Sequence, residues 1–411
     1  MHMSVCLYRS FTLHFHMPFY LCSMKPWLLV IVIFLLFVVE LLRIWFIMPF
    51  PGSQEGGTLR LAYFMSNNIW WMRLLLYIIT AQFLFRFILR RKVFAAIIVF
   101  SMLIIYGVMT YYLVYKLNAS AMFKQQQNPV YATAANNSVN EGKLVIGVVI
   151  NGEAKAYPIE IIGYHHQVRD VIGRQELMVT YCTVCRSGRV FSPVVNGNIT
   201  NFSLVGMDKF NAMFEDEETG SWWQQATGIA IAGKMKGTAL PEIYSRQMSL
   251  HAWLTEFPDS KILQPDDNFL KQYNQLTGYD EGKVNNDLEH RDPLPWQNKS
   301  WVIVAKVGEH KRAYDYAELE KRHVINDTLG GKEIAVTLAL DNKSFYAFER
   351  RNDGVVYQFF YDSKFTNGLG DNNSNLTWSF SGQARLSEDS TIQLRQIPVY
   401  QEFYHTFKDF E

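Results

Sequence analysis

Three apolar stretches in the first 117 residues constrain this chain more than any other feature. They run from Pro26 to Met48, from Asn68 to Leu89 and from Val93 to Leu117. Each is long enough to cross a bilayer as a helix, which takes about 20 residues. The first stretch continues into PFPGSQEGG and lacks the small-residue cleavage site of a signal peptide. We therefore expect an N-terminal tail over residues 1–25 and a three-helix transmembrane anchor in membrane lipid over residues 26–117.

The loop between the second and third stretches sets the orientation that we expect for this anchor. It carries Arg90, Arg91 and Lys92. Short loops rich in Lys and Arg stay on the cytoplasmic side of a membrane. With three spans, the chain after Leu117 then lies on the opposite side, in the periplasm or another extracytoplasmic space. Such an oxidising compartment permits a disulfide.

The remainder of the chain is predicted to be a mainly β (α+β) soluble region. Residues 118–142 are polar and rich in Asn and Gln, which is typical of a tether. From Lys143 onward, short apolar runs alternate with turn signals such as Asn151-Gly152 and Asn196-Gly197. The net charge is +1, and no basic stripe with interleaved aromatic residues is present. We therefore expect no nucleic-acid partner.

An internal repeat divides this soluble region. The segment from Leu144 matches the segment from Trp301 without gaps, at a constant offset of 157 residues. The identities pair Ala156-Tyr157 with Ala313-Tyr314, His166 with His323, Asp170 with Asp327, Gly173 with Gly330, Val179-Thr180 with Val336-Thr337, and Phe191 with Phe348. We expect a first repeat over residues 143–265, a linker over 266–298 and a degenerate second repeat over 299–411.

Cys182 and Cys185 belong to the first repeat alone, because Ala339 and Asn342 stand at the equivalent positions of the second. They form the only thiol pair after Phe50, and a reversible dithiol, a metal site and an inert bridge are all compatible with their spacing. A disulfide between Cys182 and Cys185 would close a very small loop and remove little chain entropy, so it would stabilise the fold only weakly. This counts against the inert bridge. Arg186, if it points inward, would favour a thiolate, whereas a solvated loop charge is its plainer interpretation.

The surroundings of the motif keep a metal site open as an alternative. Apolar runs flank the thiols on both sides, which predicts a strand–turn–strand knuckle rather than the helix start of thioredoxin. A structural zinc site needs four ligands, so His165 or His166 would have to complete it, whereas two thiolates alone suit Cu(I). His166 has a partner in the thiol-free repeat, whereas His165 aligns with Arg322. His165 is therefore the stronger candidate for a ligand or a general acid/base, beside the plainer interpretation as a surface histidine.

Four motifs in the first repeat resemble the bacterial domain-of-unknown-function family 3179. They are GEAKAYPIEIIGYHHQVRD, VTYCTVCRSGRVF, NAMFEDEETGSWWQQATGIAIAG and WLTEFPDSKIL. Some members are described as selenoproteins, which implies that the position of Cys182 can hold selenocysteine and favours redox or metal chemistry. His166, where an acidic residue often stands, and Arg186 depart from the commoner pattern. The resemblance also implies a bacterial inner-membrane protein with a periplasmic soluble region.

From these observations we predict a membrane-anchored extracytoplasmic protein with thiol–disulfide oxidoreductase activity on an unknown small-molecule thiol or protein substrate. Cys182 is expected to be the attacking thiol and Cys185 the resolving thiol, with Arg186 and His165 as supporting groups. The alternative is a copper- or zinc-binding module without catalytic turnover. Its ligands would be Cys182, Cys185, His165 and His166.

Overall fold

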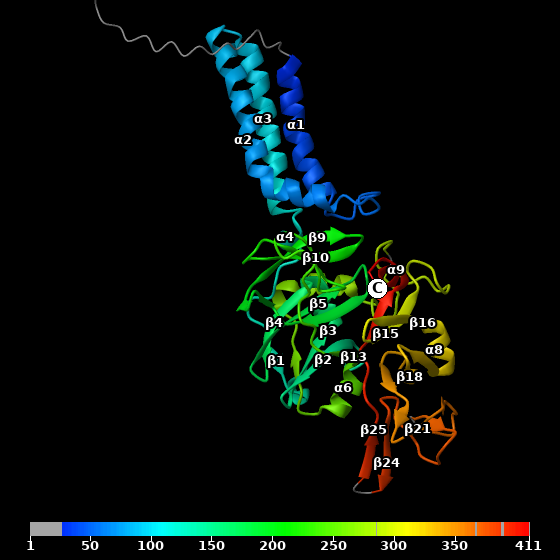
Figure 1. The fold of residues 1–411 in the computed structure, drawn as a ribbon. Helices are drawn as coiled ribbons and strands as arrows, with labels where there is room; N and C mark the ends of the chain where they lie inside the picture. The colour runs from blue at the N-terminus through cyan, green and yellow to red at the C-terminus, as the bar shows by residue number, and fades with distance from the viewer. Residues whose placement is uncertain (1–26, 285, 366–367, 388–389, 411) are drawn as a thin grey trace, which may run out of the picture. The chain divides into compact units, whose positions relative to one another are not determined.

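The computed structural model describes residues 27–284, 286–365, 368–387 and 390–410 (Figure 1). Its residues group into two compact units. The first unit contains the described chain up to Glu40 together with Asn68–Met109. The second unit contains Leu41–Asn67 and the chain from Thr110 onward.

Three long apolar helices begin the described chain: α1 (Trp27–Trp45), α2 (Leu59–Leu89) and α3 (Val93–Tyr115). All three are long and apolar enough to cross a membrane, which confirms the predicted set of candidate spans. The second helix begins at Leu59, earlier than the expected Asn68, so it also includes the residues between these two positions. The chain therefore carries a three-helix segment of the kind that anchors proteins in membranes.

One buried carboxylate connects the three helices of the first unit. Glu40 of α1 is fully buried and accepts hydrogen bonds from Arg73 of α2, with an Nη2–Oε2 distance of 2.8 Å. The hydroxyl of Tyr106 on α3 donates to the same carboxylate at 3.0 Å. A charge among apolar helices is costly unless it is paired, so this cluster fixes how the helices pack.

The first part of the second unit, up to residue 276, contains short helices and many short strands. The helices are α4 (Ala119–Met122), α5 (Ile159–His165), α6 (Leu250–Glu256) and α7 (Leu270–Tyr273), with 3-10 turns at Ala134–Asn136, Asp267–Phe269 and Asn274–Leu276. The strands are β1 (Tyr131–Ala132), β2 (Leu144–Ile150), β3 (Glu153–Pro158), β4 (Gln167–Ile172), β5 (Gln175–Cys182), β6 (Ser187–Phe191), β7 (Val194–Val195), β8 (Asn198–Ile199), β9 (Phe202–Asp208), β10 (Asn211–Asp216), β11 (Trp222–Gln224), β12 (Ala230–Ala232), β13 (Arg246–Ser249) and β14 (Lys261–Leu263).

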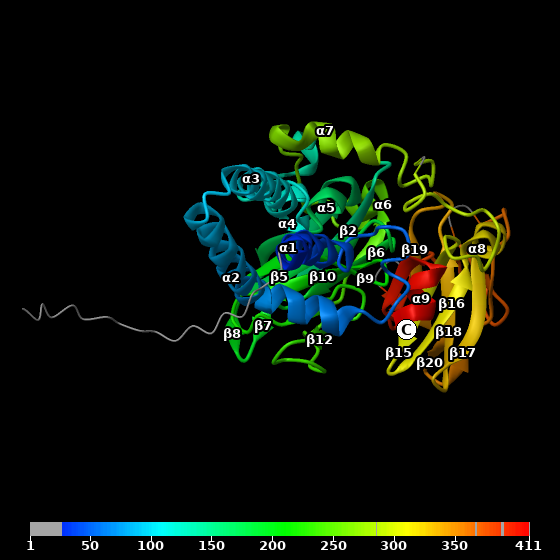
Figure 2. The ribbon, with the colours of Figure 1, turned by 90° about the horizontal axis from the view of Figure 1, so that it is seen from above.

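The later part of this unit contains α8 (Tyr316–Arg322), α9 (Tyr404–Phe410) and a second series of strands. They are β15 (Trp301–Val307), β16 (His310–Asp315), β17 (Val324–Leu329), β18 (Lys332–Leu338), β19 (Phe345–Glu349), β20 (Arg351–Asn352), β21 (Val355–Val356), β22 (Phe359–Phe360), β23 (Gly370–Asp371), β24 (Gln383–Ser387), β25 (Ser390–Gln393) and β26 (Val399–Phe403). Helix α8 packs against β15 to β18 (Figure 2). The soluble region is therefore mainly β, as predicted.

The strands form several small sheets rather than one large sheet. The first part has sheets of order β1-β14-β3-β2-β13, β4-β5-β6 and β12-β11-β10-β9, and the second part has sheets of order β16-β15-β26 and β17-β18-β19. Asn151-Gly152, with φ of 50° and 82°, and Asn196-Gly197, with φ of 51° and 85°, join strands that pair antiparallel. Two positive φ angles are the mark of tight hairpin turns, which these Asn-Gly pairs predicted.

The segment expected to be a tether, residues 118–142, differs from that expectation. Its Tyr131–Ala132 strand, β1, pairs with β14 at the edge of the first sheet. Ala119 of α4 is only 2% exposed and belongs to the same apolar cluster as Cys182 and Cys185. The segment is polar on average, yet its few apolar residues and its backbone hydrogen bonds attach it to the folded body.

Candidate functional site

Cys182 and Cys185 occupy a strand–turn–strand knuckle, as the flanking apolar runs predicted. Cys182 ends β5 and pairs with Ser187 of β6, and Arg186 closes the turn with φ of 52°. Both cysteines are free, and both are fully buried in an apolar cluster. Any reactant that meets these sulfurs must therefore reach them inside the protein.

A tight turn between β9 and β10 presents polar groups to the two sulfurs. The Phe210 carbonyl accepts from the Cys185 thiol at 3.3 Å, and the Cys182 sulfur lies 3.6 Å from the same oxygen. The side-chain amide of Asn211 donates to the Cys185 sulfur at 3.3 Å. Lys209 and Phe210 have φ of 48° and 65°, a region that residues other than glycine rarely adopt. Strained turns of this kind are concentrated at functional sites.

The surroundings move the pKa values of the two thiols in opposite directions. Burial alone raises the pKa of Cys182, but hydrogen bonds from the Cys185 thiol and the Ala212 amide, together with the charge of Lys299, bring it below the ordinary value. Burial raises the pKa of Cys185 well above the ordinary value, and its hydrogen bond to Cys182 adds to this rise. The arrangement therefore favours a Cys182 thiolate that accepts a hydrogen bond from a protonated Cys185.

Lys299 supplies the positive charge that lowers the pKa of Cys182. Its ammonium donates to the carbonyl of Val184, between the two cysteines, at 2.8 Å and to the carbonyl of Leu288. Burial lowers the pKa of Lys299 to about 8. The same Val184 carbonyl accepts from His405 Nε2 at 3.1 Å, and burial together with the Lys299 charge lowers the pKa of His405 to about 4. Lys299 is therefore charged and His405 neutral at pH 7.

Arg186 is buried rather than solvated, with 1% of its side chain exposed. Its guanidinium donates to the carbonyls of Tyr279 at 3.0 Å and Asp280 at 3.2 Å. It also lies 3.8 Å from the ring centroid of Trp301. These contacts tie the thiol knuckle to the segment between the two series of strands. An action of Arg186 on the thiols stays a prediction.

The two neighbouring histidines are buried and hydrogen-bonded. His165 Nδ1 donates to the carbonyl of Lys124, and its Nε2 accepts from the Tyr273 hydroxyl at 2.7 Å. His166 Nδ1 donates to the carbonyl of Tyr181 at 2.8 Å. Burial lowers the pKa of both imidazoles. His165 is thus a core residue rather than a surface histidine, and its role as a general acid/base stays a prediction.

The metal-ligand set considered from the sequence requires the histidines and the thiols to converge. Among the residues that the structure describes, no group of three or more His, Cys, Asp or Glu side chains could hold a metal ion. Both ring nitrogens of His165 already have partners in Lys124 and Tyr273. The four-ligand arrangement is therefore not assembled in the described part of the chain.

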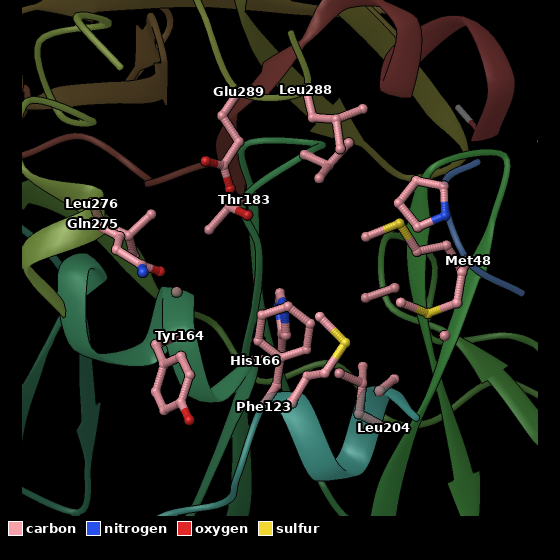
Figure 3. Close-up of a pocket in the computed structure, with 18 of the residues that line it drawn as sticks. Met48, Phe123, Tyr164, His166, Thr183, Leu204, Gln275, Leu276, Leu288 and Glu289 are labelled. Carbon is pink, nitrogen blue, oxygen red and sulfur yellow. The ribbon is translucent and has the colours of Figure 1, made fainter. Parts of the chain in front are cut away.

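An apolar cavity of about 540 Å³ lies beside the thiol knuckle (Figure 3). Thr183 and Val184, the two residues between the cysteines, form part of its wall, and so does Ala212, whose amide binds Cys182. Other lining residues are Met48, Met122, Phe123, His166, Leu204 and Leu288. A volume of this size suits a small organic ligand. The cavity offers a route by which such a ligand comes within one residue layer of the sulfurs.

Comparison with known proteins gives the chain a family. The family model described as "Protein of unknown function (DUF3179)" matches residues 125–411. The chain belongs to this family. The resemblance predicted from the four sequence motifs is thereby confirmed. Searches of curated proteins and of solved structures found no match. The chemistry of this DUF3179 chain is therefore argued from its own residues.

Sequence reasoning about this DUF3179 chain missed Lys299, His405 and the Phe210 turn. Lys299 lies 115 residues after Val184, the residue whose carbonyl it binds, and His405 lies 221 residues after it. No spacing rule connects such distant positions. The only available signal was weak: Lys299 is a lone cation beside the apolar strand that starts at Trp301.

Proposed function

We propose that this DUF3179 protein is a membrane-anchored thiol–disulfide oxidoreductase with Cys182 and Cys185 as its redox pair. The observation that carries the proposal is the asymmetric environment of the two sulfurs. Hydrogen bonds from the Cys185 thiol and the Ala212 amide lower the pKa of Cys182, whereas burial and the neighbouring Cys182 sulfur raise the pKa of Cys185. A thiolate next to a protonated thiol is the arrangement that disulfide exchange requires.

The two cysteines have different roles in this proposal. The Cys182 thiolate attacks one sulfur of a disulfide reactant, and an S–S bond to Cys182 forms as the reactant's own S–S bond breaks. The departing sulfur takes up the proton that Cys185 loses. The Cys185 thiolate then attacks the Cys182 sulfur, which forms the Cys182–Cys185 disulfide and releases the second half of the reactant, protonated by solvent, as a thiol. Lys299 stabilises the thiolate form of Cys182, and a thiol compound in the same compartment would return the pair to its reduced form.

We also propose that the soluble region is a tandem repeat in which only the first copy is catalytic. The elements β2, β3, α5 and β4 each begin and end 157 residues before β15, β16, α8 and β17. His166 and His323 follow the equivalent helices with the same φ of 58°. Each donates from Nδ1 to a strand carbonyl, that of Tyr181 at 2.8 Å or Leu338 at 3.0 Å.

The soluble region is proposed to lie outside the cytoplasm, in the periplasm of a bacterial cell. The Arg90-Arg91-Lys92 loop between α2 and α3 supports this orientation. A reporter that is active only outside the cytoplasm should work when it is fused after Gly142. Activity only for a fusion near Lys92 would reverse the topology and remove the argument from an oxidising compartment.

Trapping with single cysteine variants tests the redox proposal. Cys185→Ser should accumulate a mixed disulfide through Cys182 with an added small disulfide, because the resolving thiol is missing. Cys182→Ser should accumulate far less, since Cys185 stays protonated. Metal analysis of the reduced protein provides the contrary outcome. Stoichiometric copper or zinc, together with no trapped disulfide in either variant, would favour the metal-binding module instead.

A further inference from the structure

The apolar cavity beside the thiol knuckle has a wall that comes from several parts of the chain. Met48, Met122, Leu204 and Leu288 make it apolar, and Phe123 and His166 contribute rings to it (Figure 3). The ring centroids of Phe123 and His166 lie 4.5 Å apart at an interplanar angle of 72°. Such a wall favours a flat, apolar ligand over a charged one.

Four of the lining residues come soon after two of the long apolar helices in the sequence. Met48 and Pro49 follow α1 closely, and Ala119 and Met122 follow α3 closely. Both helices are long and apolar enough to cross a membrane. A ligand that dissolves in a bilayer has the apolar surface that this wall would bury favourably.

Burial of the sulfurs limits the kind of reactant that can use them. Cys182 and Cys185 are both 0% exposed, so a cysteine on the surface of a folded partner protein cannot reach them in this conformation. Thr183, Val184 and Ala212 belong both to the sulfur surroundings and to the cavity wall. The residues around the sulfurs thus form part of the cavity wall, although neither cysteine lines the cavity itself.

We propose that this cavity binds an isoprenoid quinone, which accepts electrons from the Cys182–Cys185 dithiol. The inference rests on the proposed redox function and names its electron acceptor. A quinone combines a flat ring, an apolar tail and a capacity for two electrons, which suits an apolar wall beside a dithiol. His166 donates through Nδ1, so its neutral ring offers Nε2 as a hydrogen-bond acceptor to a quinol hydroxyl.

The proposed step balances in atoms and electrons. The Cys182 thiolate adds to a ring carbon of the quinone and forms a C–S bond. The Cys185 proton moves to a quinone oxygen, and the Cys185 thiolate then attacks the Cys182 sulfur. An S–S bond forms as the C–S bond breaks, and its electron pair returns to the ring. Solvent supplies the second proton, so the quinone leaves as quinol with two electrons and two protons. Contact between ring and sulfur requires the Thr183-Val184 wall to move, because neither cysteine lines the cavity.

The test uses the full chain with Cys6→Ser and Cys22→Ser, which leaves Cys182 and Cys185 as its only thiols. The protein is reduced and held in detergent without oxygen, with a quinone that carries one isoprene unit. Quinol formation is followed by ultraviolet absorbance and thiol loss by a mass-shifting alkylating reagent. We expect one quinol for each pair of thiols lost, and no quinol from Cys182→Ser. Thiols that diamide oxidises but the quinone leaves intact would overturn the quinone inference and leave the redox proposal standing. Thiols that neither reagent oxidises would overturn both.

Cavity-filling variants locate the binding site. Met122→Trp and Gln275→Trp both place an indole at the cavity wall. Each should raise the KM for the quinone at least tenfold. Leu340→Trp is the matched control, because Leu340 is 39% exposed, Met122 is 38% exposed, and Leu340 lies outside this cavity. An unchanged KM in both cavity variants would show that the quinone reacts elsewhere, which would overturn the inference.

Discussion

The thiol-bearing strands of the first segment, Leu144–Phe191, and the thiol-free strands of the second, Trp301–Glu349, share their internal contacts but differ in chemistry. The Tyr157 hydroxyl donates to Asp170 at 2.6 Å, and the Tyr314 hydroxyl donates to Asp327 at 2.8 Å. These pairs keep the same positions although the residues around them have diverged. Contacts that persist without the thiols serve the fold rather than the reaction.

Two further contacts follow the same rule in the chain that continues from each segment, after Phe191 and after Glu349. The indole of Trp223 donates to Asp216 at 2.8 Å, and that of Trp378 donates to Asp371 at 2.7 Å. The difference lies at the knuckle. Cys182 has the ammonium of Lys299 nearby, whereas the equivalent turn of the second segment carries Asp341, whose carboxylate accepts from Ser344 and Ser249.

The largest expected effect comes from moving the thiols between the segments. A chain with Cys182→Ser and Cys185→Ser should lose at least 100-fold in dithiol oxidation, and adding Ala339→Cys and Asn342→Cys should not restore it. The transplanted thiols would lie near a carboxylate instead of an ammonium, which disfavours the thiolate. Ala339→Cys with Asn342→Cys in the otherwise native chain is the control and should keep full activity. Recovery of activity would show that the two knuckles are interchangeable.

The shared Asp–Trp pairs should matter equally in both segments. Asp216→Ala and Asp371→Ala each leave a buried indole N–H and nearby backbone amides without an acceptor. The expected loss is about 3 kcal/mol in the free energy of unfolding for each variant, measured from denaturant midpoints. A loss confined to Asp216→Ala would mean that the second segment does not depend on the shared contact.

A smaller matched effect is expected at two glycines that contact equivalent phenylalanines. Gly228 has φ of 68° and an added Cβ would lie 2.5 Å from Phe191, whereas Gly382 has φ of 75° and its Cβ would lie 2.8 Å from Phe348. Alanine at either position should cost about 2 kcal/mol, from backbone strain and the clash together. Gly152→Ala is the control, because its φ is 82° but its Cβ meets open space, so about 1 kcal/mol is expected. Equal losses at all three glycines would show that the clash with phenylalanine adds nothing to the cost of backbone strain.

The local features of this chain were predictable from sequence, and the long-range ones were not. Apolar length predicted the three helices, and Asn-Gly pairs predicted hairpin turns. Each of these signals lies within a few residues of its effect. The strand formed by Tyr131–Ala132 depends on an edge offered by β14, more than 100 residues later, so polar composition alone suggested a tether.

The candidate site was predicted only in part, because some of its groups come from residues far from the thiols in sequence. The Cys-x-x-Cys spacing located the knuckle, and adjacency in the chain then favoured Arg186 as the supporting cation. In the structure Arg186 donates to the carbonyls of Tyr279 and Asp280, and its action on the thiols stays a prediction. Lys299, which is distant in sequence, lowers the pKa of Cys182. A side chain next to a thiol in sequence can point away from it, because the turn conformation decides its direction.

The smallest expected effect distinguishes Lys299 from Arg186 as the cation that acts on Cys182. Lys299→Met removes a positive charge that lowers the pKa of Cys182, so that pKa should rise. Thiolate absorbance of Cys182 in a Cys185→Ser background, titrated with pH, measures the shift. The thiolate fraction at a given pH should fall. The difference should narrow above pH 8, because burial lowers the pKa of Lys299 to about 8 and its charge is lost there in the native chain.

A matched control strengthens this titration. Lys306→Met removes a half-buried lysine that pairs with Glu242, and it should leave the pKa of Cys182 unchanged. Arg186→Lys keeps the charge but loses the paired hydrogen bonds to the Tyr279 and Asp280 carbonyls, so it should lower stability more than it moves the titration. If Arg186→Lys moves the midpoint and Lys299→Met does not, adjacency in sequence identified the supporting cation correctly. The difference between the two segments would then lie in the turn itself rather than in the distant lysine.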